Sequence, residues 1–152
     1  MKKAMSMIEI IFVIVIIGTL AGVAIPKLFA GRDDAYALKL KEQHALIITN
    51  LEQYSQSMLY ETGSKKFPKN IYFGNKTGVV TDSENLVFNK LAECNSSKSN
   101  APCWTSVNNG TGENTITFHF NNKKSISFAY SQTNKSLICN NISECNKLKI
   151  GK

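Results

Sequence analysis

The sequence lacks the motifs that mark common catalytic sites. It contains no G-x-S-x-G nucleophile elbow, no glycine-rich phosphate loop and no zinc signature. It has only two histidines, His44 and His119, and these fall on separate expected elements with no visible partner. We therefore expect no enzyme activity, no cofactor and no bound metal, and we interpret His44 as a buried structural histidine.

The four cysteines also lack the spacing of a metal site. There is no C-x-x-C pair, and the intervals between Cys94, Cys103, Cys139 and Cys145 suit no common zinc module. An even number of cysteines behind an export-like segment instead favours disulfides in an oxidising compartment. Four cysteines allow three pairings, of which we favour the local one, Cys94–Cys103 with Cys139–Cys145, because it closes two short loops.

Basic residues are in excess, but no arginine cluster accompanies them. The formal net charge is +7, and residues 121–152 hold six lysines against one acid, Glu144, whereas residues 29–61 are acidic. Such a basic region attracts nucleic acid or anionic surfaces. Since aromatic residues do not interleave with the lysines either, we favour a solvated surface and keep DNA as a less favoured partner.

The first 28 residues contain a long apolar run. Met5 to Ile25 is 21 residues long, enough for a helix of about 31 Å, and Glu9 is its one charged residue. A secretory signal peptide or a plain membrane anchor explains the run and the two lysines before it, but neither explains Glu9. A carboxylate inside a membrane helix costs about 2.5–3.5 kcal/mol on insertion scales, so Glu9 needs a partner.

Cleavage after Ala4 would supply that partner. The new chain would begin at Met5 with a positive amine, and Glu9 would be its fifth residue. The amine and the carboxylate then share one apolar layer, within a chain or between neighbouring chains of a helical bundle. Each buried Glu9 would neutralise the amine of the next subunit, because burying either charge alone is costly.

This arrangement resembles the class III signal of type IV pilins and type II secretion pseudopilins. The stretch that carries the resemblance is Ala4-Met5-Ser6-Met7-Ile8-Glu9 with the apolar run after it, although Ala4 replaces the usual Gly and Met5 the usual Phe. The resemblance covers about residues 1–60. It implies that a prepilin peptidase removes residues 1–4 and methylates the amine of Met5.

The same resemblance implies a membrane protein that polymerises. It implies a single-pass protein of the bacterial inner membrane with a periplasmic head, which an inner-membrane assembly platform extracts into a filament of pilin or pseudopilin subunits. Gly18 and Pro26 fall where the family carries helix-weakening residues. They would let the helix unwind in a filament, or they are simply a tolerated kink.

Beyond Pro26 the pattern continues as helix, and Gly63 is expected to end it. Apolar residues recur there at intervals of three and four, which places them in one stripe on a helix face. We expect this stripe to lie against the sheet of the head. It consists of Leu40, His44, Ile47, Leu51, Tyr54 and Met58.

The middle of the chain gives weaker signals. Asp82 is expected to cap a short helix that runs to Glu93, and Trp104 is expected to anchor the core. Asn95, which has Glu93 two residues before it, resembles the longer acceptor pattern of bacterial N-glycosylation. The buried side of the short helix would carry Leu86, Val87, Leu91 and Ala92.

The last third of the chain predicts an antiparallel meander. Residues 115–120, 125–130 and 136–139 read as three strands, the first two alternating strictly, with polar turns between them. One face would be apolar, and His119 would lie exposed on the other. The apolar face would consist of Ile116, Phe118, Phe120, Ile126, Phe128 and Tyr130.

Together these patterns predict an α+β fold in which a long N-terminal helix packs on a C-terminal antiparallel sheet. We expect a leader at 1–4, a transmembrane and polymerisation helix at 5–28, an amphipathic helix at 29–62, and a head with cysteine-bridged loops at 63–152. The expected function is a structural subunit of a type IV pilus, a type II secretion pseudopilus or a DNA-uptake apparatus. The alternative is an exported, disulfide-bonded periplasmic binding protein with an ordinary signal peptide or membrane anchor.

Overall fold

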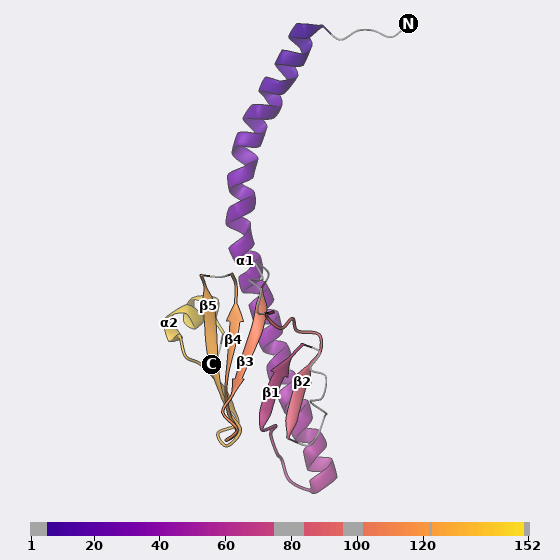
Figure 1. Cartoon of the computed structure of the whole chain (residues 1–152), viewed down its shortest axis with the longest axis vertical. Coiled ribbons are helices and arrows are strands. Elements are labelled where there is room, and N and C mark those ends of the chain that lie inside the picture. Colours follow the sequence, from indigo (N-terminus) through magenta and orange to yellow (C-terminus); the bar gives the residue numbers. More distant parts are fainter. Residues whose placement is uncertain (1–5, 75–83, 96–101, 122, 151–152) are drawn as a thin grey trace, which may run out of the picture. The chain divides into compact units, whose positions relative to one another are not determined.

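The computed structural model describes residues 6–74, 84–95, 102–121 and 123–150, without the side chains of residues 25–30 and 33. The chain divides into two compact units, Met1–Ala35 and Tyr36–Lys152, and we call the second unit the head. A long helix belongs to both units, and the other elements belong to the head (Figure 1). In chain order the elements are α1 (Met7–Thr62), β1 (Asn70–Phe73), β2 (Asn85–Phe88), β3 (Cys103–Asn108), β4 (Glu113–His119), β5 (Ser125–Ser131), β6 (Ser136–Cys139) and α2 (Ile142–Leu148).

The head is built on a four-stranded antiparallel sheet in the order β3-β4-β5-β6. The three strands expected from alternation are present, with Phe118 opposite Ile126 and Tyr130 opposite Leu137. The sequence did not reveal β3, which adds a fourth strand along β4. The expected apolar face is confirmed, because all six of its side chains are at most 1% exposed.

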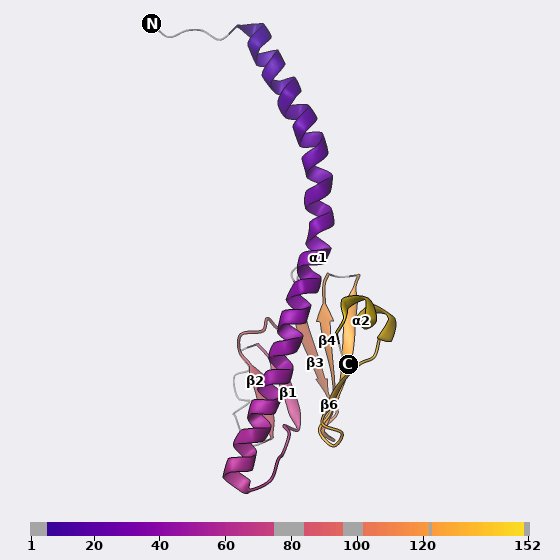
Figure 2. The same cartoon turned by 180° about the vertical axis from the view of Figure 1, so that it is seen from behind.

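Within the head, α1 covers that apolar face of the sheet (Figures 1 and 2). The expected stripe is the buried side of the helix: Leu40 and Ile47 are completely buried, and His44 and Tyr54 are half-buried. An aromatic ring of the sheet contacts the helix here, since the ring centroids of His44 and Phe128 lie 5.2 Å apart. Gly63 follows the helix with φ 72°, a left-handed conformation that suits glycine and ends the helix as expected.

The helix expected between Asp82 and Glu93 is wrong. Residues 85–88 form β2, which pairs in parallel with β1, and Asp82 itself lies outside the described residues. The pairing places Phe88 beside Phe73, with their ring centroids 5.8 Å apart. Asn-Leu-Val-Phe is rich in residues that suit a strand, and a partner strand outweighs a weak helix signal.

Trp104 is the centre of the core between these two sheets. It is 1% exposed, and its ring lies 5.1 Å from that of Phe73 and 5.0 Å from that of Phe118. Its indole N–H donates a hydrogen bond to Gln43 of α1 at 2.9 Å. Trp104 therefore joins β1, the main sheet and α1, as its expected role as a core anchor requires.

His119 lies on the opposite face of the sheet, as expected, but it is half-buried rather than exposed. Its Nε2 lies 3.0 Å from the hydroxyl of Thr105, which belongs to the neighbouring strand β3. The expectation of full exposure failed because β3 was not anticipated.

Three side chains, from β4, from β5 and from the turn after β5, hold the loop that follows α1. Gln132 donates a hydrogen bond to the carbonyl of Phe67, Tyr130 to that of Pro68, and Asn114 to that of Lys69. Burial raises the pKa of the Tyr130 hydroxyl, which keeps it protonated as the donor. Three successive carbonyls are thus satisfied, that of Pro68 in a buried hydrogen bond and the other two in part-buried ones, and this fixes where the chain returns from the helix to the sheets.

The cysteines form the two local disulfides, Cys94–Cys103 and Cys139–Cys145. The first ties the segment before β3 to the start of that strand. The second ties the end of β6 to α2, a short helix that the sequence reading missed. No cysteine is free.

We predict that Tyr130→Phe destabilises the head by about 1–3 kcal/mol, because the buried carbonyl of Pro68 loses its donor. Urea unfolding of the full chain in detergent, followed by the fluorescence of Trp104, measures the change. Tyr60→Phe is the matched control, since Tyr60 is 87% exposed, and it should leave the midpoint unchanged. Equal midpoints for the two variants would contradict the role of this hydrogen bond.

We predict that replacing either cysteine pair by serines costs about 2–3 kcal/mol, because the two loops are of similar length, with sequence separations of 9 and 6. The same urea experiment compares the two double variants with the unmodified chain. A stability unchanged by either replacement would show that loop closure contributes nothing to the head.

Candidate functional site: the exposed apolar segment of α1

The first part of α1 is apolar on every side. Met7–Ala24 is long and apolar enough to cross a membrane, a test that a signal sequence near the N-terminus also passes, and none of it is buried by the described chain. Ile8 is 75% and Phe12 68% exposed. Soluble monomers rarely expose so large a continuous apolar surface, so this segment needs lipid or protein around it.

Glu9 lies in the first turn of α1. The carbonyl of Ser6 accepts hydrogen bonds from the backbone N–H groups of Glu9 and Ile10, at 3.0 and 3.3 Å, and so starts the helix. A carboxylate at the third helical position interacts favourably with the positive end of the helix dipole. The Ser-x-x-Glu spacing, typical of a capping box, is a signal for this local role that the sequence reading missed.

The proposed partner of Glu9 cannot be placed in this structure. Ala4 and Met5, the residues of the expected cleavage and methylation, lie outside the described residues. The carboxylate of Glu9 is exposed in the single chain. Pairing between Glu9 and the amine of Met5 therefore stays a prediction.

Gly18 and Pro26, the expected helix-weakening residues, both lie inside α1, and the helix continues through them. A Cβ atom added at Gly18 would meet nothing within 4 Å, so no contact within the single chain requires glycine there. Unwinding of this region in a filament stays a prediction.

The remaining candidates do not converge on a chemical site. Asn95 is exposed, but the serines that complete its acceptor triplet lie outside the described residues. Within the described ranges no group of three or more His, Cys, Asp or Glu side chains is placed to hold a metal ion.

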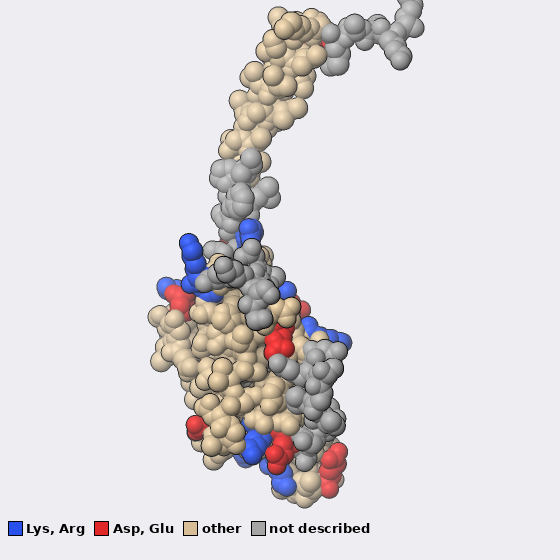
Figure 3. Space-filling view, in the orientation of Figure 1, with Lys and Arg blue, Asp and Glu red and all other residues tan. Residues whose placement is uncertain are grey.

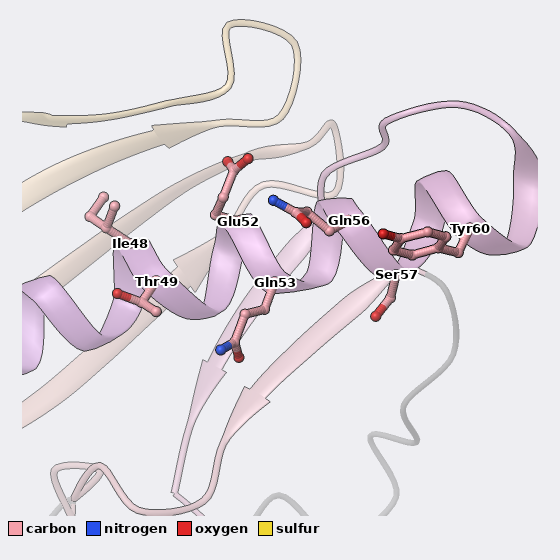
Figure 4. Close-up of a pocket in the computed structure, with 7 residues that line it drawn as sticks. All are labelled: Ile48, Thr49, Glu52, Gln53, Gln56, Ser57 and Tyr60. Carbon is pink, nitrogen blue, oxygen red and sulfur yellow. The ribbon is translucent and has the colours of Figure 1, made fainter.

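An open hollow lies along the outer surface of α1 in the head (Figure 4). One helix supplies all of its lining side chains, and Glu52 and Gln53 project from different sides of that helix. Glu52 instead accepts a hydrogen bond from Lys65 at 3.3 Å. The hollow is therefore a helix surface, without converging groups that would act on a substrate. Its lining consists of Ile48, Thr49, Glu52, Gln53, Gln56, Ser57 and Tyr60.

Comparison of the chain with protein-family models, with curated proteins and with solved structures finds no match.

We expect His44 to make the stability of the head depend on pH. Burial lowers the pKa of its imidazole below 6.5, and its Nε2 is buried without a hydrogen-bond partner among the described atoms. Below pH 6.5 the unfolded chain binds a proton more readily than the folded one, so stability falls as the pH falls from 6.5 towards the lower folded value. We predict a lower urea midpoint at pH 5 than at pH 7.5.

The variant His44→Leu tests the assignment. It removes the titrating group from the stripe, so the difference between the two pH values should shrink. A difference of the same size in this variant would assign the pH dependence to other groups.

Proposed function

We propose that this chain is a structural subunit of a pilin-like filament, either a type IV pilus or a type II secretion pseudopilus. The observation that carries the proposal is the segment Met7–Ala24, which exposes apolar side chains on every side and has one acid, Glu9, in its first turn. Lipid covers such a surface before assembly, and the equivalent helices of neighbouring subunits cover it afterwards.

Glu9 gives this association a charge pair. Between helices in lipid, apolar surface alone provides little driving force, because lipid tails are as apolar as leucine. A carboxylate that meets the Met5 amine of a neighbour adds a specific attraction, and removing one partner of a buried ion pair costs about 3–5 kcal/mol. In this proposal the pair also sets the axial offset between subunits.

The head supports the proposal by its layout. Helix α1 packs on an antiparallel sheet, and two disulfides tie the ends of the head's strands to neighbouring segments. This is the α+β arrangement that the resemblance of residues 1–60 to pilins implies. Disulfides also suit a domain that works on the oxidising side of a membrane.

The mature N-terminus tests the proposal directly. We predict that the intact mass and N-terminal sequence of the chain from a host with a prepilin peptidase show loss of residues 1–4 and a methylated Met5. A mature chain that starts near Ile25 or Gly31 would instead indicate a cleaved signal peptide and an exported, disulfide-bonded protein.

We predict that Glu9→Gln leaves membrane insertion intact but reduces incorporation into filaments at least tenfold, because the neutral amide cannot neutralise a buried amine. Crosslinked oligomers in membranes measure the incorporation. Glu52→Gln is the control on the same helix, since Glu52 belongs to the head and lies outside the apolar segment. Normal incorporation of Glu9→Gln would refute the pairing role.

A further inference from the structure

Four lysines gather on one part of the head. Lys123 and Lys124 belong to the turn between β4 and β5, and Lys147 and Lys149 belong to α2 and its C-terminal end. All four are exposed. We call this group the turn–α2 patch; Figure 3 shows basic side chains gathered over these elements beside an acid.

The two halves of the patch are electrostatically coupled. Lys147 and Lys124 both lower the pKa of the Glu144 carboxyl, through a hydrogen bond of 2.9 Å from Lys147 and a longer-range attraction to Lys124. Four lysines against this one acid leave a net charge of +3. Lys124 also lies over the buried ring of Phe120, 5.0 Å from its centroid, which holds the turn near the core.

The turn–α2 patch lies at the end of the head where α1 enters it, near Tyr36. His44 contacts Phe128, whereas the loop after α1 contacts Tyr130, so β5 runs in the same direction as the helix. Tyr36 is about 12 Å of helix before His44, and Lys124 is about 13 Å of strand before Phe128. The two residues therefore lie at the same level of the head.

The opposite end of the head has balanced charge. Its lysines include the exposed Lys65 and the half-buried Lys69, which lie 3.3 Å from Glu52 and 3.9 Å from Glu84. Lys66 and Lys135 are also found at this end, as are the acids Glu61 and Glu113. Of the described charges compared at the two ends of the head, the basic excess thus lies at the end with the patch.

We propose that the turn–α2 patch binds the anionic headgroups of the membrane in which the apolar segment is embedded. Ala24 and Tyr36 are twelve positions apart, about 18 Å as helix. This stretch of α1, which we call the tether, therefore leaves the head at the same level as the patch. Its length keeps the patch within reach of the bilayer surface. Each lysine near an anionic surface strengthens binding about fivefold, and the tether adds a high effective concentration.

The same lysines fit DNA less well. Proteins that bind single-stranded DNA combine a basic groove with exposed aromatic rings, and proteins that recognise the base sequence of duplex DNA favour arginine. The patch holds no arginine, and its aromatic neighbour Phe120 is 1% exposed. Its chemistry is that of four lysine point charges, which suits a fluid layer of phosphate groups.

The inference rests on the membrane insertion in the proposed function, but not on cleavage or assembly. Its test uses the full chain in nanodiscs of phosphatidylcholine, with or without phosphatidylglycerol. Brief acylation of amines and peptide mass spectrometry then give a modification rate for each lysine. We expect Lys123 and Lys124 to react about fivefold more slowly with the anionic lipid at low salt, and the protection to vanish at about 0.5 M salt.

Two charge-matched variants sharpen the test. Lys123→Gln/Lys124→Gln should reduce the protection of Lys147 and Lys149, whereas Lys66→Gln/Lys135→Gln, which removes the same charge from the other end, should not.

Each contrary outcome has its own meaning. Equal rates in the two lipids, in a chain that inserts, would overturn the inference alone. Stronger protection by duplex DNA than by anionic lipid at the same salt would overturn it in favour of DNA. A chain that fails to enter nanodiscs would overturn the proposed function as well.

Discussion

The head depends on one contact, the burial of a single stripe of α1 against the apolar face of the β3–β6 sheet. The stripe and the sheet face are both apolar and each covers the other, so each element stabilises the other. Ile47 from the helix and Phe118 and Phe128 from the sheet are completely buried. The hydrogen bonds from Trp104 to Gln43 and from Tyr130 to Pro68 then fix how the helix lies on the sheet.

The parts of the fold that follow a simple period could be predicted from the sequence. The helical stripe and the alternation along β4 and β5 predict the two apolar surfaces that form the core. The short spacing within each cysteine pair predicts local disulfides. Strands β1 and β2 could not be predicted, because they have four residues each and pair in parallel across a long connection. The helix predicted from Asp82 to Glu93 was wrong because aspartate is common in loops as well as at helix N-termini.

The candidate site could also be predicted only in part from the sequence. The apolar run and Glu9 are visible in the sequence, and the structure adds the helix start at Ser6 and the exposure of every large side chain in Met7–Ala24. The turn–α2 patch was visible only as an excess of lysine near the C-terminus. The lysines lie at one end of the head because β5 runs in the same direction as α1. That direction is known only from the fold.

The order of the disulfides has a consequence for how the protein matures. Each cysteine is bonded to its neighbour along the chain, Cys94 to Cys103 and Cys139 to Cys145. In the proposed topology the head would cross the membrane with its N-terminal part first, so Cys94 and Cys103 would arrive together before Cys139 and Cys145. An oxidant that joins cysteines in order of arrival would then produce the native bonds directly, without later reshuffling.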